Sequence, residues 1–405
     1  MPAPIDSATP LASASDRRAT ILAGFLGWTL DAFDFFLVVM TLTAIGQEFH
    51  KTDLEIAVSL TLTLAFRPVG AFVFGLLADR YGRRIPLMID LVFFSIVEVL
   101  TGLAPSYGWF LVLRALFGIG MGGEWGVGAS LVMEKVAPER RGAISGFLQQ
   151  GYAAGYLLAA VAYFLVFPRW GWRPLFFIGG VPALLALFIR MRVQESAVWK
   201  KTRHATWGDL ARGISSNVKL FFYLMLLMAL MNMVSHGTQD LYPTFLQRDW
   251  GLSPHARSAL TAWSMVGALA GGMFFGRWSD RLGRRRAIAV ALAGAVLAIP
   301  LWAFAPSLPL LVAGAFVMQF LVQGAWGVIP AHITELSPDA VRGFLPGFAY
   351  QCGVLIAGSI ATFQARLAAG SSYAWGMGWT AGTVFVLCAI AALAGRERRG
   401  VVYGA

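Results

Sequence analysis

The segment Gly75-Leu76-Leu77-Ala78-Asp79-Arg80-Tyr81-Gly82-Arg83-Arg84 decides the fold because it occurs twice. It returns as Gly276-Arg277-Trp278-Ser279-Asp280-Arg281-Leu282-Gly283-Arg284-Arg285, a shift of 201 residues (276 − 75). A second pair of segments has the same shift: Trp125-Gly126 through Glu134 to Arg141-Gly142, and Trp326-Gly327 through Glu335 to Arg342-Gly343. Two separate motifs with one offset predict two structural repeats that follow each other in parallel order.

The composition is typical of a polytopic membrane protein. The chain of 405 residues is 58% hydrophobic and 13% charged, with a mean hydropathy of +0.66, whereas a soluble protein has about a quarter charged residues. The net charge of +11 does not indicate a nucleic-acid partner, because the basic residues lie in short loops between apolar segments, where they set topology. Cys352 and Cys388 lie in apolar stretches and are expected to be packing residues.

Twelve apolar segments of about 20 residues match the roughly 30 Å hydrocarbon thickness of a bilayer. The sequence therefore predicts an all-α membrane protein with twelve transmembrane helices in two six-helix halves. The expected halves are residues 1–192 and 218–405, joined by a polar cytoplasmic linker at 193–217. The predicted spans are 20–42, 56–77, 86–104, 109–133, 143–167, 174–192, 218–241, 257–277, 287–305, 309–334, 344–366 and 375–395.

The basic residues also predict the orientation. With both termini in the cytoplasm, the predicted cytoplasmic side carries 24 Lys and Arg residues and the other side six, a strong positive-inside bias. The first nineteen residues are polar and lack the apolar core of a signal peptide, so we expect an uncleaved N-terminus. The expected location is the bacterial cytoplasmic (inner) membrane.

The repeated Gly-x-x-x-Asp-Arg-x-Gly-Arg-Arg pattern, with Pro138-Glu139-Arg140-Arg141-Gly142 after the fourth span, resembles the major facilitator superfamily over essentially the whole chain. This resemblance implies a transporter that works by alternating access. Asp79 and Asp280 are each expected at the N-terminus of a neighbouring helix, where the dipole favours an anion. We expect the charged motif residues to be conformational latches at a gate, with a purely topological role as the alternative: Asp79, Arg83, Glu134, Arg141, Asp280, Arg284, Glu335 and Arg342.

The seventh predicted span ends in a polar stretch, Asn232 to Thr244. At about 100° per residue its polar side chains fall within an arc of about 140°, and ionisable groups inside a membrane helix normally handle a solute or a proton. The alternative is interhelical hydrogen bonding. The polar side chains on this arc are Asn232, Ser235, His236, Gln239 and Asp240.

This stretch resembles the signature of the monocarboxylate–proton symporters, which are related to fungal lactate/pyruvate permeases and grouped with the sialate–proton symporters. The family pattern Asn-x-x-Ser/Thr-His-x-Ser/Thr-Gln-Asp-x-x-x-Thr is met without a departure. By this resemblance His236, Gln239 and Asp240 shape substrate affinity and proton coupling, and Arg67 of the second span belongs to the site.

The residues themselves also single out Arg67. It lies 12 residues before Asp79, about 18 Å along a helix, which is near the bilayer midplane, where an unpaired guanidinium is very costly. We expect it to face a cavity and to bind a carboxylate in bidentate fashion. The alternative is a fixed salt bridge to Asp31 or Asp34 on the first span, and a substrate carboxylate would be able to displace such a partner.

The predicted substrate-binding residues are Arg67, Asn232, Ser235, His236, Gln239, Tyr350 and Gln351. The candidates for proton coupling are, in order, Asp240 with His236, then Asp34, then Asp31, because carboxylates and an imidazole can alternate between protonated and ionised forms.

The sequence also predicts roles for four further intramembrane charges. Glu98 and Arg114 are expected to pair, Glu124 to border the cavity and Asp90 to belong to the gate. No metal site, cofactor or enzymatic nucleophile–base set is expected.

We therefore expect a proton-coupled symporter that imports small monocarboxylates such as lactate or pyruvate, with a sialate or aromatic-acid symporter as the alternative. Its expected partners are the substrate, a proton and the lipid bilayer, and a monomer is the expected form.

Overall fold

The computed structural model describes residues 13–202 and 206–404, and within these ranges the chain is helical without a strand. Twelve of its helical segments are long and apolar enough to cross a membrane, which confirms the predicted number. The N-terminal helices are α1 (Ala14–Glu48), α2 (Asp53–Tyr81), α3 (Arg84–Gly102), α4 (Tyr107–Lys135), α5 (Arg141–Gln149), α6 (Gly151–Trp170), α7 (Arg173–Ile178) and α8 (Pro182–Arg192). The C-terminal helices are α11 (Val218–Gln239), α12 (Tyr242–Arg248), α13 (Pro254–Leu282), α14 (Arg284–Ala303), α15 (Leu308–Leu336), α16 (Leu345–Ala357), α17 (Ile360–Ala369) and α18 (Tyr373–Ala394).

Three of the spans that the sequence predicts as single helices are broken, and the seventh continues beyond its predicted end as a second helix. The fifth span comprises the 3-10 turn Pro138–Arg140, α5 and α6, and the sixth, seventh and eleventh comprise α7 with α8, α11 with α12, and α16 with α17. The breaks fall at 150, 179–181, 240–241 and 358–359, each within two residues of a glycine or proline. Proline lacks the N–H that continues a helix and glycine lowers the cost of a bend. Apolar composition alone does not reveal such interruptions.

The repeated motif ends two helices in the same way. Gly82 follows α2 with a φ of 102°, and Gly283 follows α13 with a φ of 97°. Only glycine adopts this left-handed region without strain, so each glycine lets the chain reverse directly into α3 or α14.

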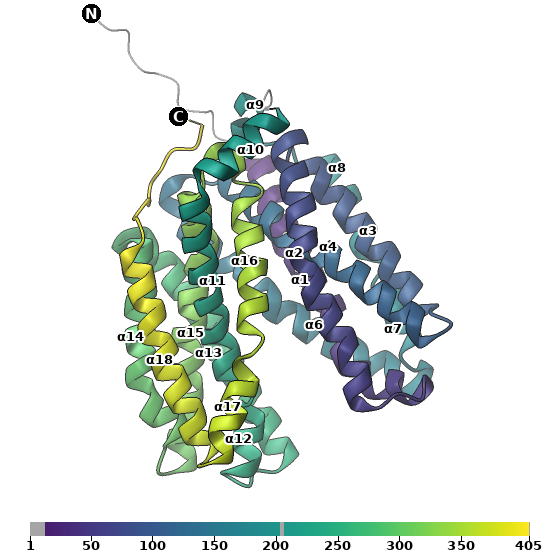
Figure 1. Ribbon diagram of the computed structural model, residues 1–405, viewed down its shortest axis with the longest axis vertical. Coiled ribbons are helices and arrows are strands. Elements are labelled where there is room, and N and C mark those ends of the chain that lie inside the picture. Colours follow the sequence, from purple (N-terminus) through teal and green to yellow (C-terminus); the bar gives the residue numbers. More distant parts are fainter. Residues whose placement is uncertain (1–12, 203–205, 405) are drawn as a thin grey trace, which may run out of the picture.

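The two groups of helices have separate apolar cores. One core draws its buried side chains from α1–α8 and the other mainly from α11–α18. We call these groups the N-terminal and C-terminal halves. Figure 1 shows them side by side, with both described chain ends and the linker helices α9 (Ala197–Thr202) and α10 (Trp207–Ser216) at one end of the molecule.

We call that end the terminal face and the other end the opposite face. In Figure 1 the two halves lie close together near the terminal face and diverge toward the opposite face. Arg203 and His204 of the predicted linker lie outside the described residues.

Candidate functional site

Arg67 lies on α2 and is 5% exposed. Its Cζ is 5.9 Å from the centre of the Tyr350 ring on α16, and its side chain hydrogen-bonds the Tyr350 hydroxyl. Nε and Nη2 have no hydrogen-bond partner. Within the described chain no carboxylate oxygen forms an ion pair with Arg67, so the structure contains no fixed salt bridge to Asp31 or Asp34. Gly122 makes this placement possible, since a Cβ there would collide with the Arg67 backbone and α4 packs directly against α2.

Tyr350, the ring beside this guanidinium, belongs to a chain of five aromatic side chains in contact, which we call the aromatic cluster: Trp28, Trp125, Tyr152, Trp326 and Tyr350. Ring centres are 4.6 Å apart for Trp125 and Tyr350 and 5.9 Å apart for Trp326 and Tyr350. Trp28 joins Trp125 at 6.3 Å and Tyr152 at 5.7 Å. The cluster thus links α1, α4 and α6 with α15 and α16. Sequence reasoning missed the role of Trp125 and Trp326, although both begin the second repeated motif.

Next to Tyr350, Gln351 is fully buried, and neither atom of its amide has a hydrogen-bond partner. Among the predicted substrate-binding residues, Gln351 is thus the second, after Arg67, with an unsatisfied polar group. Buried polar groups normally have partners, so unsatisfied ones indicate a place where a polar ligand or water binds.

The polar stretch of α11 divides into two faces. Toward α15, Gln239 Nε2 donates to Gln319 Oε1 at 2.8 Å, and Ser235 Oγ accepts from Gln323 Nε2 at 3.1 Å. Asn232 is buried and donates to the Met228 carbonyl of its own helix. Interhelical hydrogen bonding, the alternative considered above, therefore describes Ser235 and Gln239 in this state. Gln319 and Gln323 were not predicted, because their partners lie on a helix far away in sequence.

The second face carries the ionisable pair. His236 Nδ1 lies 3.2 Å from Asp240 Oδ1, and the two side chains are 42% and 41% exposed. The charges of Asp240, Arg67 and Asp31 all act on the Tyr152 hydroxyl. Tyr152 therefore borders both the Arg67 environment of the N-terminal half and the end of α11.

Asp31 and Asp34 on α1 are fully buried, and none of their carboxylate oxygens has a hydrogen-bond partner. The charge of Glu98 acts on both carboxylates, but the cation that acts on Asp31 is Arg67 and the cation that acts on Asp34 is Arg114. The two carboxylates, one helical turn apart, thus face different surroundings.

The remaining intramembrane charges also cluster in the N-terminal half. Arg114 pairs with Glu98, which confirms that prediction, and donates to Thr101 Oγ1 at 2.7 Å. Glu124 lies against Gly27 of α1. Asp90 is fully buried and interacts electrostatically with Asp31 and Glu124. Asp90 is therefore within electrostatic reach of the buried carboxylates of α1 and α4, and its assignment to the gate stays a prediction.

The charged residues of the repeated motifs join the two halves at the terminal face. Asp79 accepts hydrogen bonds from the backbone N–H groups of Gly343 and Phe344, at 2.8 and 2.9 Å. Asp280 accepts in the same way from Gly142 and Ala143, at 2.8 and 2.9 Å. Each carboxylate thus lies at the N-terminus of a helix of the other half, where the helix dipole favours an anion.

Ion pairs extend this reciprocal arrangement. Arg83 pairs with Glu134 at 3.0 Å within the N-terminal half, and Arg284 with Glu335 at 2.9 Å within the C-terminal half. Arg141 reaches Glu335 at 3.8 Å, and Arg342 reaches Glu134 at 3.7 Å, across the halves. We call these residues, with Asp79 and Asp280, the gate. Within the described residues the ion pairs between the two halves are those of the gate, at the terminal face, so the structure is closed there.

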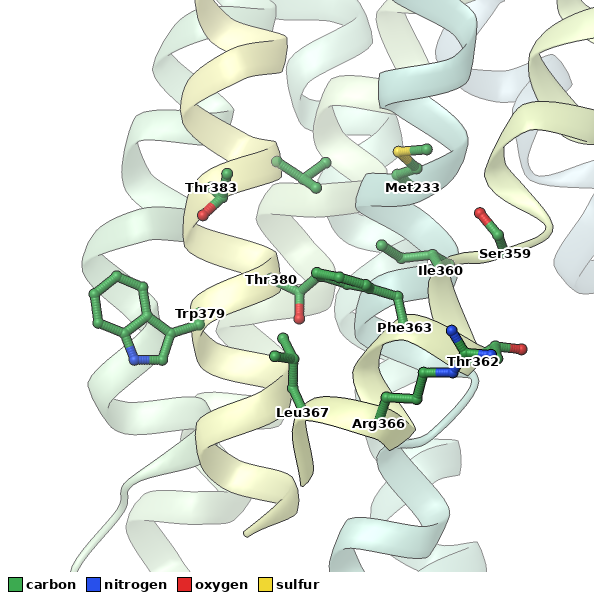
Figure 2. A pocket seen from close by; sticks show the side chains of 11 residues that line it. Met233, Ser359, Ile360, Thr362, Phe363, Arg366, Leu367, Trp379, Thr380 and Thr383 are labelled. Carbon is green, nitrogen blue, oxygen red and sulfur yellow. The ribbon is translucent and has the colours of Figure 1, made fainter. Parts of the chain in front are cut away.

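Figure 2 shows a cavity of about 660 Å³ between α17 and α18, with Met233 of α11 at its wall. Its lining is mostly apolar and contains none of the predicted site residues. Phe363 and Trp379 in this lining are 53% and 66% exposed, which is typical of a surface that faces lipid. The cavity is therefore separate from the Arg67 site. Within the described chain no three His, Cys, Asp or Glu side chains are arranged to hold a metal ion.

Comparisons with known proteins agree with this architecture. The family model described as Major Facilitator Superfamily matches residues 24–247 and 224–403. A probable 4-methylmuconolactone transporter of Cupriavidus pinatubonensis is 32% identical, over 86% of this chain and 83% of that protein. A carboxylic acid transporter protein homolog of Saccharomyces cerevisiae is 30% identical over 85% of this chain, which spans only 60% of the yeast protein. The solved structure of the proton:xylose symporter XylE has the same fold, with a TM-score of 0.79 at 18% identity, over 97% of this chain and 98% of that one.

Proposed function

The chain belongs to the major facilitator superfamily and is an integral membrane transporter, not an enzyme; from this premise we propose that it is a proton-coupled symporter of small monocarboxylates such as lactate or pyruvate. The observation that carries the proposal is Arg67, a buried guanidinium with two unsatisfied nitrogens. An unpaired cation at this depth is very costly, and a substrate carboxylate supplies the missing partner.

The carboxylate binds Arg67 through the planar fork of the guanidinium, for which lysine is no substitute. Tyr350 holds one side of the guanidinium and leaves Nε and Nη2 for the substrate. Gln351, the residue after Tyr350, offers a second unsatisfied polar group for the substrate. Asn232 and Gln239 orient further substrate oxygens by exchanging their present hydrogen bonds for bonds to the substrate.

Asp31 carries the coupled proton in this scheme. Its carboxylate is buried without a donor, and the charge of Arg67 acts on it. When a substrate carboxylate neutralises Arg67, an ionised Asp31 loses its only favourable charge and takes up a proton, so that substrate and proton bind together. The exposed His236–Asp240 pair receives the proton from the opposite face.

The positive-inside bias supports cytoplasmic termini in a bacterial inner membrane. The opposite face is then the outside, and the structure is the outward-open state of a monomer working by alternating access. A co-transported proton neutralises the anion, which removes about 2.3 kcal/mol of opposition per charge per 100 mV of interior-negative potential.

One observation favours a second candidate, a larger planar or aromatic acid. The aromatic cluster reaches Arg67 through Tyr350, and flat rings pack well against a flat acid. A relative named as a 4-methylmuconolactone transporter supports this candidate further.

The test is uptake of labelled lactate by vesicles that contain wild-type protein, Arg67→Ala or Arg67→Lys. We expect Arg67→Ala to abolish saturable uptake while the protein remains in the membrane, and Arg67→Lys to recover little of it, since lysine lacks the fork. Near-normal uptake by Arg67→Ala would remove Arg67 from the site. Stronger competition by benzoate or sialate than by unlabelled lactate would favour the larger acid. Alkalinisation of the medium on lactate addition, abolished by a protonophore, tests proton coupling separately.

A further inference from the structure

The segment after α18 returns across the terminal face and ends between the two halves. Figure 1 shows it rising from α18 to the end of the molecule that carries the linker helices. Gly404 N donates to Asp339 Oδ2 at 2.7 Å, and Lys201 Nζ of α9 donates to the Gly404 carbonyl at 2.8 Å. This segment, residues 395–404, is therefore fixed at both its helix end and its far end, and we call it the tail.

Tyr403 is the buried side chain of the tail, at 3% exposure. It belongs to a small apolar core with side chains of both halves and the linker, namely Val132, Met133, Val136, Leu148, Val198 and Ala331. Burial raises the pKa of its phenol, so the ring remains neutral at physiological pH. The neighbouring Val402, by contrast, is 50% exposed.

The Tyr403 ring lies between the two gate arginines that reach across the halves. The Cζ atom of Arg141 is 3.5 Å from the ring centre, and that of Arg342 is 3.7 Å away. Arg141 also donates to the Val401 carbonyl of the tail at 2.7 Å. An aromatic face attracts a guanidinium, so one neutral ring stabilises two like charges that would otherwise repel each other across the gate.

Each arginine is also fixed to its own half. Arg141 Nε donates to the Met133 carbonyl and Arg342 Nε to the Thr334 carbonyl, both at 3.1 Å. When the halves separate at the terminal face, the two guanidinium groups must move apart. A single ring can then contact at most one of them.

We propose that Tyr403 is a positioning residue of the gate, which stabilises the state closed at the terminal face by holding Arg141 and Arg342 together, and that the tail leaves this position each time the face opens. This inference rests on the alternating access of the proposed function but not on the identity of its substrate. The tail thereby sets the ratio of molecules that are closed to molecules that are open at the terminal face before any substrate binds.

The test measures the width of the terminal face directly. Spin labels at Tyr81→Cys on α2 and Arg281→Cys on α13, both exposed sites, are introduced with Cys352→Ser and Cys388→Ala to remove the native thiols. Distance distributions by pulsed electron spin resonance in detergent give the ratio of closed to open protein. No substrate is added, so failure of this proposal is distinguishable from failure of the proposed function.

Four tail variants separate the ring from the rest of the tail. Tyr403→Ala is expected to shift the ratio about tenfold toward the open terminal face, the combined effect of two lost cation–π contacts. Tyr403→Leu, which retains apolar volume without a π face, should shift it in the same direction. Tyr403→Phe retains the ring and loses only the hydrogen bond between the Tyr403 hydroxyl and Thr334, so it should shift the ratio clearly less than Tyr403→Leu, and the exposed neighbour Val402→Ala should leave the ratio at the wild-type value. An unchanged ratio in Tyr403→Leu, or an equal shift in Tyr403→Phe, would overturn the role of the ring.

Discussion

At the shift of 201 residues that relates the two gate motifs, Asp31 and Asp34 of α1 correspond to Asn232 and Ser235 of α11. The same shift relates the buried charges of α2, α3 and α4 to apolar residues of the C-terminal half. Arg67, Asp90, Glu98, Arg114 and Glu124 correspond in order to Ala268, Ala291, Ile299, Ala315 and Ala325. The two halves thus share the chemistry of the gate and differ in the chemistry of their interiors.

This difference separates two requirements of the proposed alternating-access mechanism. At the gate each half binds the other through matching contacts, because Asp79 and Asp280 each accept two backbone hydrogen bonds from the opposite half. The interior has no such requirement, and its ionisable groups are concentrated in one half. We therefore expect the N-terminal half to bind the charged groups, and the C-terminal half to contribute hydrogen-bonding amides.

The largest expected effect comes from giving the N-terminal half the residue of the other half, Asp31→Asn. In vesicles with a gradient of one pH unit, a symporter of one proton per substrate accumulates substrate about tenfold. Asp31→Asn should equilibrate without accumulation, because it has no proton site beside Arg67, but should still exchange labelled for unlabelled substrate.

The comparator is Asp240→Asn, which lies in the C-terminal half. It should retain accumulation at a lower rate, since the proton still has a binding site at Asp31. Full accumulation by Asp31→Asn, with none by Asp240→Asn, would contradict this prediction. The coupled proton would then bind on α11, in the C-terminal half.

The next largest effect concerns the ion pair between Glu98 and Arg114, both fully buried. Arg114→Ala leaves a carboxylate unpaired in the protein interior and should lower the free energy of unfolding by about 3–5 kcal/mol. The double variant Glu98→Ile with Arg114→Ala introduces the residues that the C-terminal half has at these positions, and it should recover much of that loss.

Thermal unfolding in detergent, followed by tryptophan fluorescence, measures both variants. If the double variant is no more stable than Arg114→Ala, the C-terminal half is not a guide to how this interior can be packed. The comparison would then hold for the gate alone.

The sequence predicted the parts of this architecture that depend on one helix at a time. Hydropathy located all twelve spans, and the rise per residue placed Arg67 deep in α2, where the structure buries it. The gate carboxylates were predicted at helix N-termini because the motif residues lie at the ends of apolar segments.

The parts that depend on how helices pack were beyond the sequence. Helical periodicity placed the polar residues of α11 on one arc, but it could not show that α15 covers part of that arc. Gln319 and Gln323 therefore appeared only in the structure, as partners of Gln239 and Ser235. The aromatic cluster could not be predicted either, because its members come from helices of both halves.

The smallest expected effect is the difference between two gate variants, Asp79→Asn and Asp280→Asn, compared by the spin-label distance across the terminal face. Each substitution replaces an anion that accepts two backbone hydrogen bonds from the other half, and hydrogen bonds to a charged group contribute about 1.5–3 kcal/mol. Each variant should therefore shift the closed-to-open ratio about tenfold or more. The Asp79 side chain is 0% exposed and that of Asp280 is 10% exposed, so water compensates Asp280→Asn slightly better and Asp79→Asn should have the larger effect. A shift in only one of the two variants would mean that the matching contacts do not have matching energies, and the two halves would then differ at the gate as well as inside.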